Sequence, residues 1–318
     1  MIWRKEIGGY IQLETYQRPM LYDDAILLNN GRSCLRYILE ARKINKIALP
    51  GFCCASVRNA CVQSAVQYRQ YSIREDWLPY QVKLAEDEWL YVVNFYGQLS
   101  HDDIKSLKDK YERIIIDNAQ AYFSKPLASV DTFYTCRKFF GVADGGVLYT
   151  SSYLKDDLAQ DESFDRMHFL LGRFERSASE FYDEYLQNEK HFNDGEIKTM
   201  SKLTQNLLHG IDYEHVSLRR TENFCILDDA FNKINALPLR IPQGAFAYPL
   251  LVENGLEIRR KLIEQKIYIP CLWPNVLEEL DKVTVEYNMA ANILPLPVDQ
   301  RYGAEDMEYI IGVVQENI

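Results

Sequence analysis

The chain has 318 residues, of which 47% are hydrophobic and 26% are charged. This composition allows a large buried core, and the length predicts one large domain with a smaller one attached. The formal net charge is −10 at pH 7, which argues against a nucleic-acid partner, although a local group of arginines can still bind an anion. No apolar run is long enough to cross a bilayer, and the start, MIWRKEIGGY, lacks the apolar core of a signal peptide. We therefore expect a cytoplasmic protein with no membrane partner.

The first two thirds of the sequence alternate between strand and helix patterns with short connections. This rhythm predicts an α/β fold whose central sheet is mainly parallel. The predicted elements, in chain order, are a helix from Ser33 to Lys43, a strand from Ile47 to Pro50, a helix from Ala55 to Ala65, strands from Val66 to Ser72 and from Trp89 to Tyr96, a helix from Asp102 to Lys110, and strands at Ile114 to Ile116, Val130 to Cys136 and Gly146 to Thr150.

The last third predicts helices followed by a smaller α/β domain. Charged and aromatic residues alternate from Leu154 to His209, which is typical of helices with one solvated face. The elements expected after it are a long helix from Glu214 onward, a strand at FAYPLLV, a helix from Gly255 to Gln265 and a closing helix from Asp306 to Val314. We place the domains at residues 1–213, the large domain, and 214–318, the small C-terminal domain.

The cysteines and histidines indicate neither a disulfide framework nor a metal site. The seven cysteines are an odd number, form no C-x-x-C pair and lie in apolar settings such as GFCCAS, so we expect reduced and mostly buried thiols. The five histidines show no H-x-x-x-H or H-E-x-x-H pattern. We predict no bound metal.

Asp117 and Lys138 carry the clearest chemical signal. Three isoleucines, 114–116, lead directly into Asp117, as in a buried parallel strand that delivers a carboxylate at its carboxyl end, where open α/β sheets bind ligands. Lys138 falls in a loop between two further predicted strands. A buried carboxylate and an amine on adjacent strand ends are what a pyridoxal phosphate site needs, because the acid keeps the pyridinium nitrogen protonated and the lysine forms the Schiff base.

Each of these residues also has an ordinary structural interpretation. An aspartate at a strand end is most often a cap, a salt-bridge partner or a metal ligand, and Arg137-Lys138 alone is most often a solvated basic pair. Gly31, Arg32 and Ser33 read as a helix N-terminus that Ser33 caps. The free N–H groups and the helix dipole at that start would also hold a phosphate, so both interpretations can be true together.

The order and spacing of these motifs resemble the DegT/DnrJ/StrS family of pyridoxal phosphate-dependent sugar aminotransferases, which have the aspartate aminotransferase type of fold. The family's D-x-A-Q/H motif looks like Asp117 to Gln120, and its Schiff-base lysine, seven residues before a Gly-Gly pair, looks like Lys138 before Gly145 and Gly146. Its phosphate turn, S-G-T-x-A-L, looks like Asn30 to Leu35. The likeness covers nearly the whole chain, weakly between about Leu154 and Thr204, and its other parts are Leu49 to Cys53, Asn94 to Gly97, Phe246 to Pro249 and Ile293 to Tyr302.

The resemblance implies a transaminase with pyridoxal 5'-phosphate as cofactor. Lys138 would hold the cofactor and move the proton, Asp117 would keep the ring nitrogen protonated, and Gln120 would contact the ring on its oxygen side. Thr135 is the candidate hydroxyl for the phosphate, beside Gly31, Arg32 and Ser33. The expected donor is an amino acid, glutamate first, and the expected acceptor is a nucleotide-linked keto-sugar in polysaccharide or secondary-metabolite biosynthesis. The fold type also implies a homodimer.

Two departures from the family pattern keep other functions open. Where relatives place an aromatic residue against the cofactor face, this register gives Cys54, with Phe52 two residues earlier. The family's cross-subunit segment, G-x-N-y-R-M, is matched only loosely by Asp194 to Ser201, DGEIKTMS, without its asparagine and arginine. These losses favour a non-catalytic or regulatory homologue, whereas retention of Asp117, Gln120 and Lys138 disfavours it. A sugar dehydratase is a further alternative, but those relatives replace the lysine with histidine.

Overall fold

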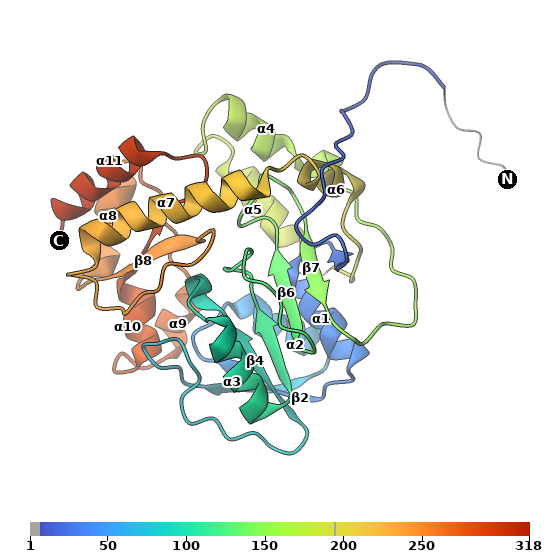
Figure 1. Ribbon diagram of the computed structural model, residues 1–318, viewed down its shortest axis with the longest axis horizontal. Helices are drawn as coiled ribbons and strands as arrows, with labels where there is room; N and C mark the ends of the chain where they lie inside the picture. Colours follow the sequence, from blue (N-terminus) through green and yellow to red (C-terminus); the bar gives the residue numbers. More distant parts are fainter. Residues whose placement is uncertain (1–6, 194) are drawn as a thin grey trace.

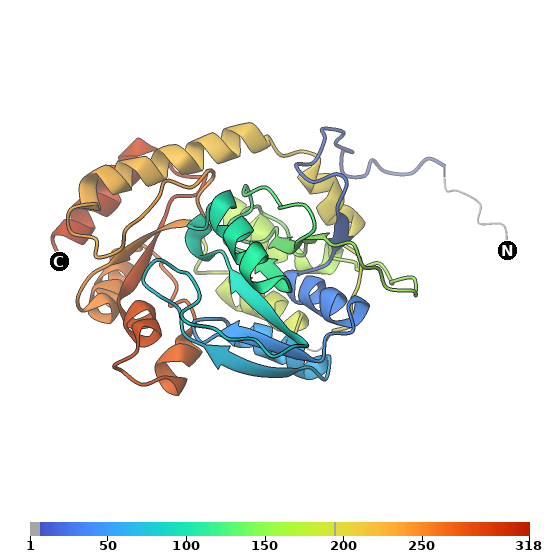
Figure 2. The same ribbon diagram turned by 60° about the horizontal axis from the view of Figure 1, so that its bottom comes forward.

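The structure is a computed structural model that describes residues 7–193 and 195–318. Residues 1–6, which open the N-terminal sequence, and Asp194, which opens the DGEIKTMS segment, lie outside the described residues. From residue 7 the chain runs as an exposed arm before it joins the body of the molecule (Figures 1 and 2). Among the described residues, no helix combines the length and the apolar character that crossing a bilayer requires.

A seven-stranded sheet in the order β1-β7-β6-β5-β4-β2-β3 forms the centre of the molecule (Figure 1). Strands β6, β5, β4, β2 and β3 are parallel, and β7 pairs antiparallel with both β6 and β1. The sheet is therefore mainly parallel, as predicted. Its strands are β1 (Ile26–Leu28), β2 (Lys46–Pro50), β3 (Gln67–Tyr71), β4 (Glu88–Val93), β5 (Ile114–Asp117), β6 (Asp131–Thr135) and β7 (Gly146–Tyr149).

Helices cover both faces of this sheet. Helices α1 (Gly31–Ala41) and α2 (Ala55–Gln63) pack against each other on one face, and α3 (His101–Tyr111) lies on the other (Figures 1 and 2). The inner strands β5 and β6 are buried on both faces, whereas the edge strand β3 is mostly exposed. Near-continuous apolar strands of this kind are what a sheet covered on both faces requires.

Two predicted boundaries are corrected by side-chain contacts. Helix α1 begins at Gly31, and its cap is Asn30, whose Oδ1 accepts a hydrogen bond from the Ser33 N–H at 2.9 Å. Ser33 is therefore inside the helix and is not its cap. The strand predicted to reach Tyr96 ends at Val93, because the chain turns in a short 3-10 helix, η1, where Tyr96 has a φ of 53°.

The C-terminal part has its own apolar core. The long helix α7 (Tyr213–Phe231), predicted from Glu214, crosses the molecule toward a two-stranded antiparallel sheet and its helices (Figure 1). These elements are β8 (Ala247–Leu251), α8 (Gly255–Glu264), α9 (Pro274–Glu279), α10 (Val285–Asn292), β9 (Ile293–Pro297) and α11 (Ala304–Gln315). The division at residues 213 and 214 stays a prediction.

The segment between the sheet and α7 contains the short turn η2 (Phe164–Arg166) and three helices with large solvated faces. These helices are α4 (His168–Glu175), α5 (Tyr182–His191) and α6 (Lys202–Leu208). Helix α4 buries no residue completely, and α5 buries only Asn188. This exposure agrees with the predicted helices of one wet face, and it leaves apolar side chains at the surface.

Candidate active site

The topology brings the predicted site residues to one edge of the sheet. Strands β5 and β6 are adjacent and parallel, so Asp117 at the end of β5 and the loop after β6 lie at the same edge. The N-terminus of α1 faces this edge, and a cavity of about 170 Å³ lies between them. Seven of the eight predicted site residues line the cavity: Gly31, Arg32, Cys54, Asp117, Gln120, Thr135 and Lys138.

The carboxylate of Asp117 is buried and held at both oxygens. Oδ2 accepts a hydrogen bond from the hydroxyl of Tyr91 at 2.5 Å, and Oδ1 accepts one from the Ala119 N–H at 2.7 Å. Burial raises the pKa of Asp117 above its ordinary value, and the Tyr91 hydrogen bond, the charge of Lys138 and the Ala119 N–H offset this only in part. These contacts fix the position of the carboxylate and favour its charged form.

Lys138 lies on a tight turn that follows β6. The N–H groups of Phe139 and Phe140 both donate to the carbonyl of Cys136, which directs the lysine side chain into the cavity. Its Nζ lies 5.5 Å from the centre of the Phe246 ring. The side chain is exposed to the cavity, and the protein atoms packed around its amine reduce the water that can reach it. This lowers the pKa of the ammonium, while the carboxylate of Asp117 opposes the change.

Gln120 presents an unused donor to the cavity. Its Oε1 accepts a hydrogen bond from the Tyr96 N–H at 2.9 Å, so the turn after β4 fixes the orientation of the amide. Its Nε2 is buried and has no partner among the described residues. A buried donor without an acceptor is costly, and a ligand oxygen in the cavity would remove that cost.

The start of α1 forms an anion-binding geometry without a serine side chain. Asn30 caps the Ser33 N–H, and among the described contacts the N–H groups of Gly31 and Arg32 donate to no protein acceptor. A Cβ on Gly31 would lie 3.4 Å from the ring of Phe133, at ordinary contact distance. At Gly146 a Cβ would lie 2.6 Å from the carbonyl oxygen of Asn30, so this glycine allows β7 to pack directly against the helix start.

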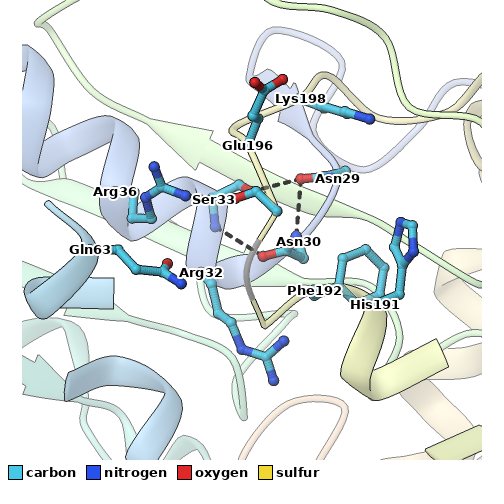
Figure 3. A pocket seen from close by; sticks show the side chains of 11 residues that line it. Asn29, Asn30, Arg32, Ser33, Arg36, Gln63, His191, Phe192, Glu196 and Lys198 are labelled. Atoms are coloured by element: carbon cyan, nitrogen blue, oxygen red, sulfur yellow. Dashed lines mark hydrogen bonds between the residues drawn. The ribbon is translucent and has the colours of Figure 1, made fainter. Parts of the chain in front are cut away.

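Ser33 is the one predicted site residue that the structure does not bring to this cavity. Its hydroxyl donates to Oδ1 of Asn29 at 2.7 Å, and its side chain lines a second cavity of about 300 Å³ (Figure 3). Arg32 lines both cavities. A role of Ser33 in cofactor binding is therefore limited to its place in the helix start.

Thr135 and Cys54 face the cavity in different settings. Thr135 ends β6, and its hydroxyl makes only a long contact of 3.5 Å with the carbonyl of Gly145. Cys54 is exposed at the cavity, whereas Phe52 is buried between Phe95 and Trp273, with ring centres 5.3 and 4.4 Å away. Phe52 is thus part of the core, and the small Cys54 side chain occupies the position where an aromatic residue was sought.

Among the cavity-lining residues that the sequence did not single out, three have clear contacts or positions in the site. Tyr91 holds Asp117, Trp273 contributes an aromatic wall from the start of α9, and Glu189 of α5 forms an ion pair with Arg137. Tyr91 had a usable signal: β4 and β5 pair in parallel with Tyr91 opposite Ile115, so Tyr91 and Asp117 point to the same face of the sheet. The other two come from segments far away in the sequence.

All seven cysteines are unpaired thiols, four of them buried. The burial of these four agrees with the prediction of mostly buried thiols. Burial raises the pKa of Cys53, Cys61 and Cys136 to about 12 each, so these thiols stay protonated at neutral pH.

Comparison with known proteins identifies the fold. No family model matches the chain, and no curated protein matches it in sequence. Three solved structures are similar to the chain over most of their length. DesV of S. venezuelae, in complex with a ketimine intermediate, has 17% identity and a TM-score of 0.65, and the match covers 93% of this chain and 85% of DesV. The sugar aminotransferase CalS13 of Micromonospora echinospora has 14% identity and a TM-score of 0.64 (93% and 88% covered), and NtdA of Bacillus subtilis with bound cofactor PMP has 14% identity and a TM-score of 0.65 (92% and 72% covered). The chain therefore has the predicted aspartate aminotransferase-like fold.

Proposed function

We propose that this chain is a pyridoxal phosphate-dependent aminotransferase of the DegT/DnrJ/StrS type. It moves an amino group from an amino acid, with glutamate as the first donor to test, to a nucleotide-linked keto-sugar. The observation that carries the proposal is the convergence of Asp117, Lys138 and the start of α1 on one cavity within this fold. The structural neighbours support it, since CalS13 is described as a sugar aminotransferase and NtdA was determined with PMP.

The residues around the cavity fit pyridoxal phosphate. The N–H groups of Gly31 and Arg32 and the hydroxyl of Thr135 would hold its phosphate, and the unpartnered Nε2 of Gln120 would donate to its ring oxygen. The carboxylate of Asp117 would accept a hydrogen bond from the protonated pyridine nitrogen. When bound, the cofactor supplies an electron-accepting ring on which an amino group can be exchanged.

The side chains of the protein would orient the reactants and move the proton. The hydrogen bonds from Tyr91 and Ala119 favour the charged form of Asp117, and this charge favours a protonated nitrogen opposite it. Lys138 has a lowered pKa, so a larger fraction of its amine is neutral near pH 7 than for a surface lysine. Its Nζ can then take up and return the substrate proton.

Glutamate alone tests this function, because half of a transamination needs no acceptor. Purified protein loaded with pyridoxal phosphate should release 2-oxoglutarate and lose the visible absorbance of the cofactor when glutamate is added. Lys138→Ala should bind the cofactor weakly and show no conversion. If the wild-type protein binds the cofactor but converts neither glutamate, glutamine nor aspartate, and keto-sugar nucleotides leave its PMP-loaded form unchanged, the non-catalytic alternative is correct.

We further propose that the enzyme works in the cytoplasm as a homodimer. Several large apolar side chains lie exposed on and around α4 and α5, where a second subunit would cover them: Phe164, Leu171, Phe174, Tyr182 and Tyr185. Leu171 and Phe174 are three residues apart in α4, so they share one face of the helix. Exposed apolar clusters of this kind mark protein contact surfaces.

A further inference from the structure

The guanidinium of Arg220 on α7 is buried in a position that links three distant segments. Only 2% of the residue is exposed, and none of the described carboxylates pairs with it directly. Its Nη2 donates to the carbonyl of Phe139 at 3.2 Å, Nη1 to the carbonyl of Ala245 at 2.9 Å and Nε to Oε1 of Gln300 at 2.8 Å. All three nitrogens therefore have acceptors, although the charge has no direct counterion.

Each of the two carbonyl acceptors is adjacent in sequence to a residue of the lysine site. Phe139 follows Lys138, and Ala245 precedes Phe246, whose ring centre is 5.5 Å from Lys138 Nζ. One guanidinium thus fixes the backbone on both sides of this contact. It also lies over the ring of Phe139, with Cζ 4.7 Å from the ring centre.

Gln300 completes the arrangement from the segment after β9. Its Oε1 accepts from Arg220, and its Nε2 donates to the same Phe139 carbonyl at 2.8 Å. The Phe139 carbonyl therefore receives two hydrogen bonds from side chains that lie far away in the sequence. Phe246 and Gln300 belong to two of the sequence motifs singled out above, and this network gives both a role.

A buried cation without a direct counterion is costly, and burial lowers the pKa of Arg220 to about 10. An apolar side chain would fill the same space without that cost, so the network indicates a requirement for fixed geometry at Phe139. We propose that Arg220, supported by Gln300, is a positioning residue for Lys138, which holds the amine in the cavity against Phe246 and facing Asp117. The role in catalysis rests on the function proposed above, but the position of the amine can be measured without cofactor.

Competitive acetylation with limiting acetic anhydride, read by peptide mass spectrometry across a pH series, reports the reactivity and pKa of Lys138 in the cofactor-free protein. Lys155, an exposed lysine, is the internal reference. Wild-type Lys138 should titrate below an ordinary lysine. In Arg220→Lys, Arg220→Met and Gln300→Leu the amine should leave its packed position beside Phe246 and titrate higher, and its relative reactivity near pH 7 should fall about tenfold for each unit of pKa increase.

The three variants separate positioning from charge. Arg220→Lys keeps the cation but cannot make all three hydrogen bonds, and Gln300→Leu changes no charge. If the Lys138 pKa changed only in Arg220→Met and in neither of the other two variants, the loss of charge would explain the effect and the proposal would be overturned. If Arg220 variants do not fold, Gln300→Leu decides the outcome by itself.

Arg259→Met is the matched control. Arg259 is another buried arginine, on α8; it donates to the carbonyl of Ile293 at 3.1 Å and does not line the cavity. The Arg259→Met substitution should lower the melting temperature and leave the titration of Lys138 unchanged. If the Lys138 pKa shifted equally in Arg259→Met, the cause would be a general loss of packing in the protein, and the proposal would be overturned. Labelling of wild-type Lys138 by pyridoxal phosphate and borohydride is measured in parallel, and its failure would remove the proposed function without touching the acetylation result.

Discussion

The hydroxyl of Tyr91 donates a hydrogen bond of 2.5 Å to Oδ2 of Asp117, and both residues line the cavity. This contact links the middle of β4 to the end of β5. It lowers the pKa of a carboxyl group that burial alone would raise further. Tyr91 is therefore the residue that most directly favours the charged form of Asp117.

Tyr91→Phe should raise the pKa of Asp117. A hydrogen bond to a charged group contributes about 1.5 to 3 kcal/mol, which corresponds to about 1 to 2 pH units. Asp117 then loses its charge at a higher pH, so the acid limb of the profile of kcat against pH for the glutamate half-reaction should move to higher pH. Tyr71→Phe is the control, because the Tyr71 hydroxyl donates to the carbonyl of Tyr91 and does not touch Asp117. An unmoved acid limb in Tyr91→Phe would contradict the assignment.

The sequence pattern predicted the mainly parallel sheet, and it led to two residues, Asp117 and Lys138, that line one cavity. Buried apolar runs such as Ile114–Ile116 specify strands by burial alone, and a parallel sheet places their ends at one edge. Strand β9 was missed because its sequence, ILPLP, contains two prolines, which argue against a strand. Strand β1 has only three residues and carries too little pattern to detect.

The details of the site depend on contacts that no local pattern contains. Asn30 and Ser33 are both good capping residues, and only the three-dimensional turn shows that Asn30 accepts the hydrogen bond. The contact of Arg220 with the Phe139 carbonyl joins residues 81 positions apart. Sequence spacing can place a motif on an element, but it does not give the partners that orient its side chains.

Asp117→Asn should separate stability from activity. The folded-state pKa of Asp117 is raised, so its contribution to stability is present at low pH and is lost as the pH rises through that pKa. The amide keeps both contacts, because the Tyr91 hydroxyl can accept as well as donate. Cofactor-free Asp117→Asn should therefore melt higher than wild type at pH 7, and the difference should vanish in acid.

The same substitution should slow proton abstraction about a thousandfold or more, because several kcal/mol of electrostatic stabilisation are lost. Cofactor binding should persist, since the shape of the side chain is kept. Differential scanning calorimetry across pH and single-turnover kinetics with glutamate measure the two effects. Unchanged turnover would place the partner of the ring nitrogen elsewhere.

Gly146→Ala should disturb the start of α1. The added Cβ would lie 2.6 Å from the carbonyl oxygen of Asn30 and 2.7 Å from Sγ of Cys34, and the backbone atom cannot move without moving the helix. Overpacking of this kind costs about 1 to 3 kcal/mol of unfolding free energy. Urea unfolding should show that loss, and pyridoxal phosphate should bind more weakly because the phosphate turn is displaced.

Gly141→Ala is the control for this substitution. A Cβ on Gly141 would have no atom within 4 Å, so the variant should keep the stability and cofactor affinity of wild type within experimental error. Equal affinities for pyridoxal phosphate in Gly146→Ala and wild type, with both proteins folded, would argue against phosphate binding at the α1 start.

The exposed face of α4 gives the final prediction, which concerns the proposed homodimer. Phe174 is 91% exposed and Leu171 60% exposed, on a helix at the outside of the molecule (Figure 1). If a second subunit covers them, Leu171→Asp with Phe174→Asp should convert a dimer to a monomer, because a charge buried without a partner is strongly unfavourable. Leu218→Asp on α7, where the leucine is 56% exposed, should leave the dimer intact. Sedimentation velocity at micromolar concentration distinguishes these outcomes: a wild-type monomer rejects the dimer, and a double variant that stays dimeric moves the interface away from α4.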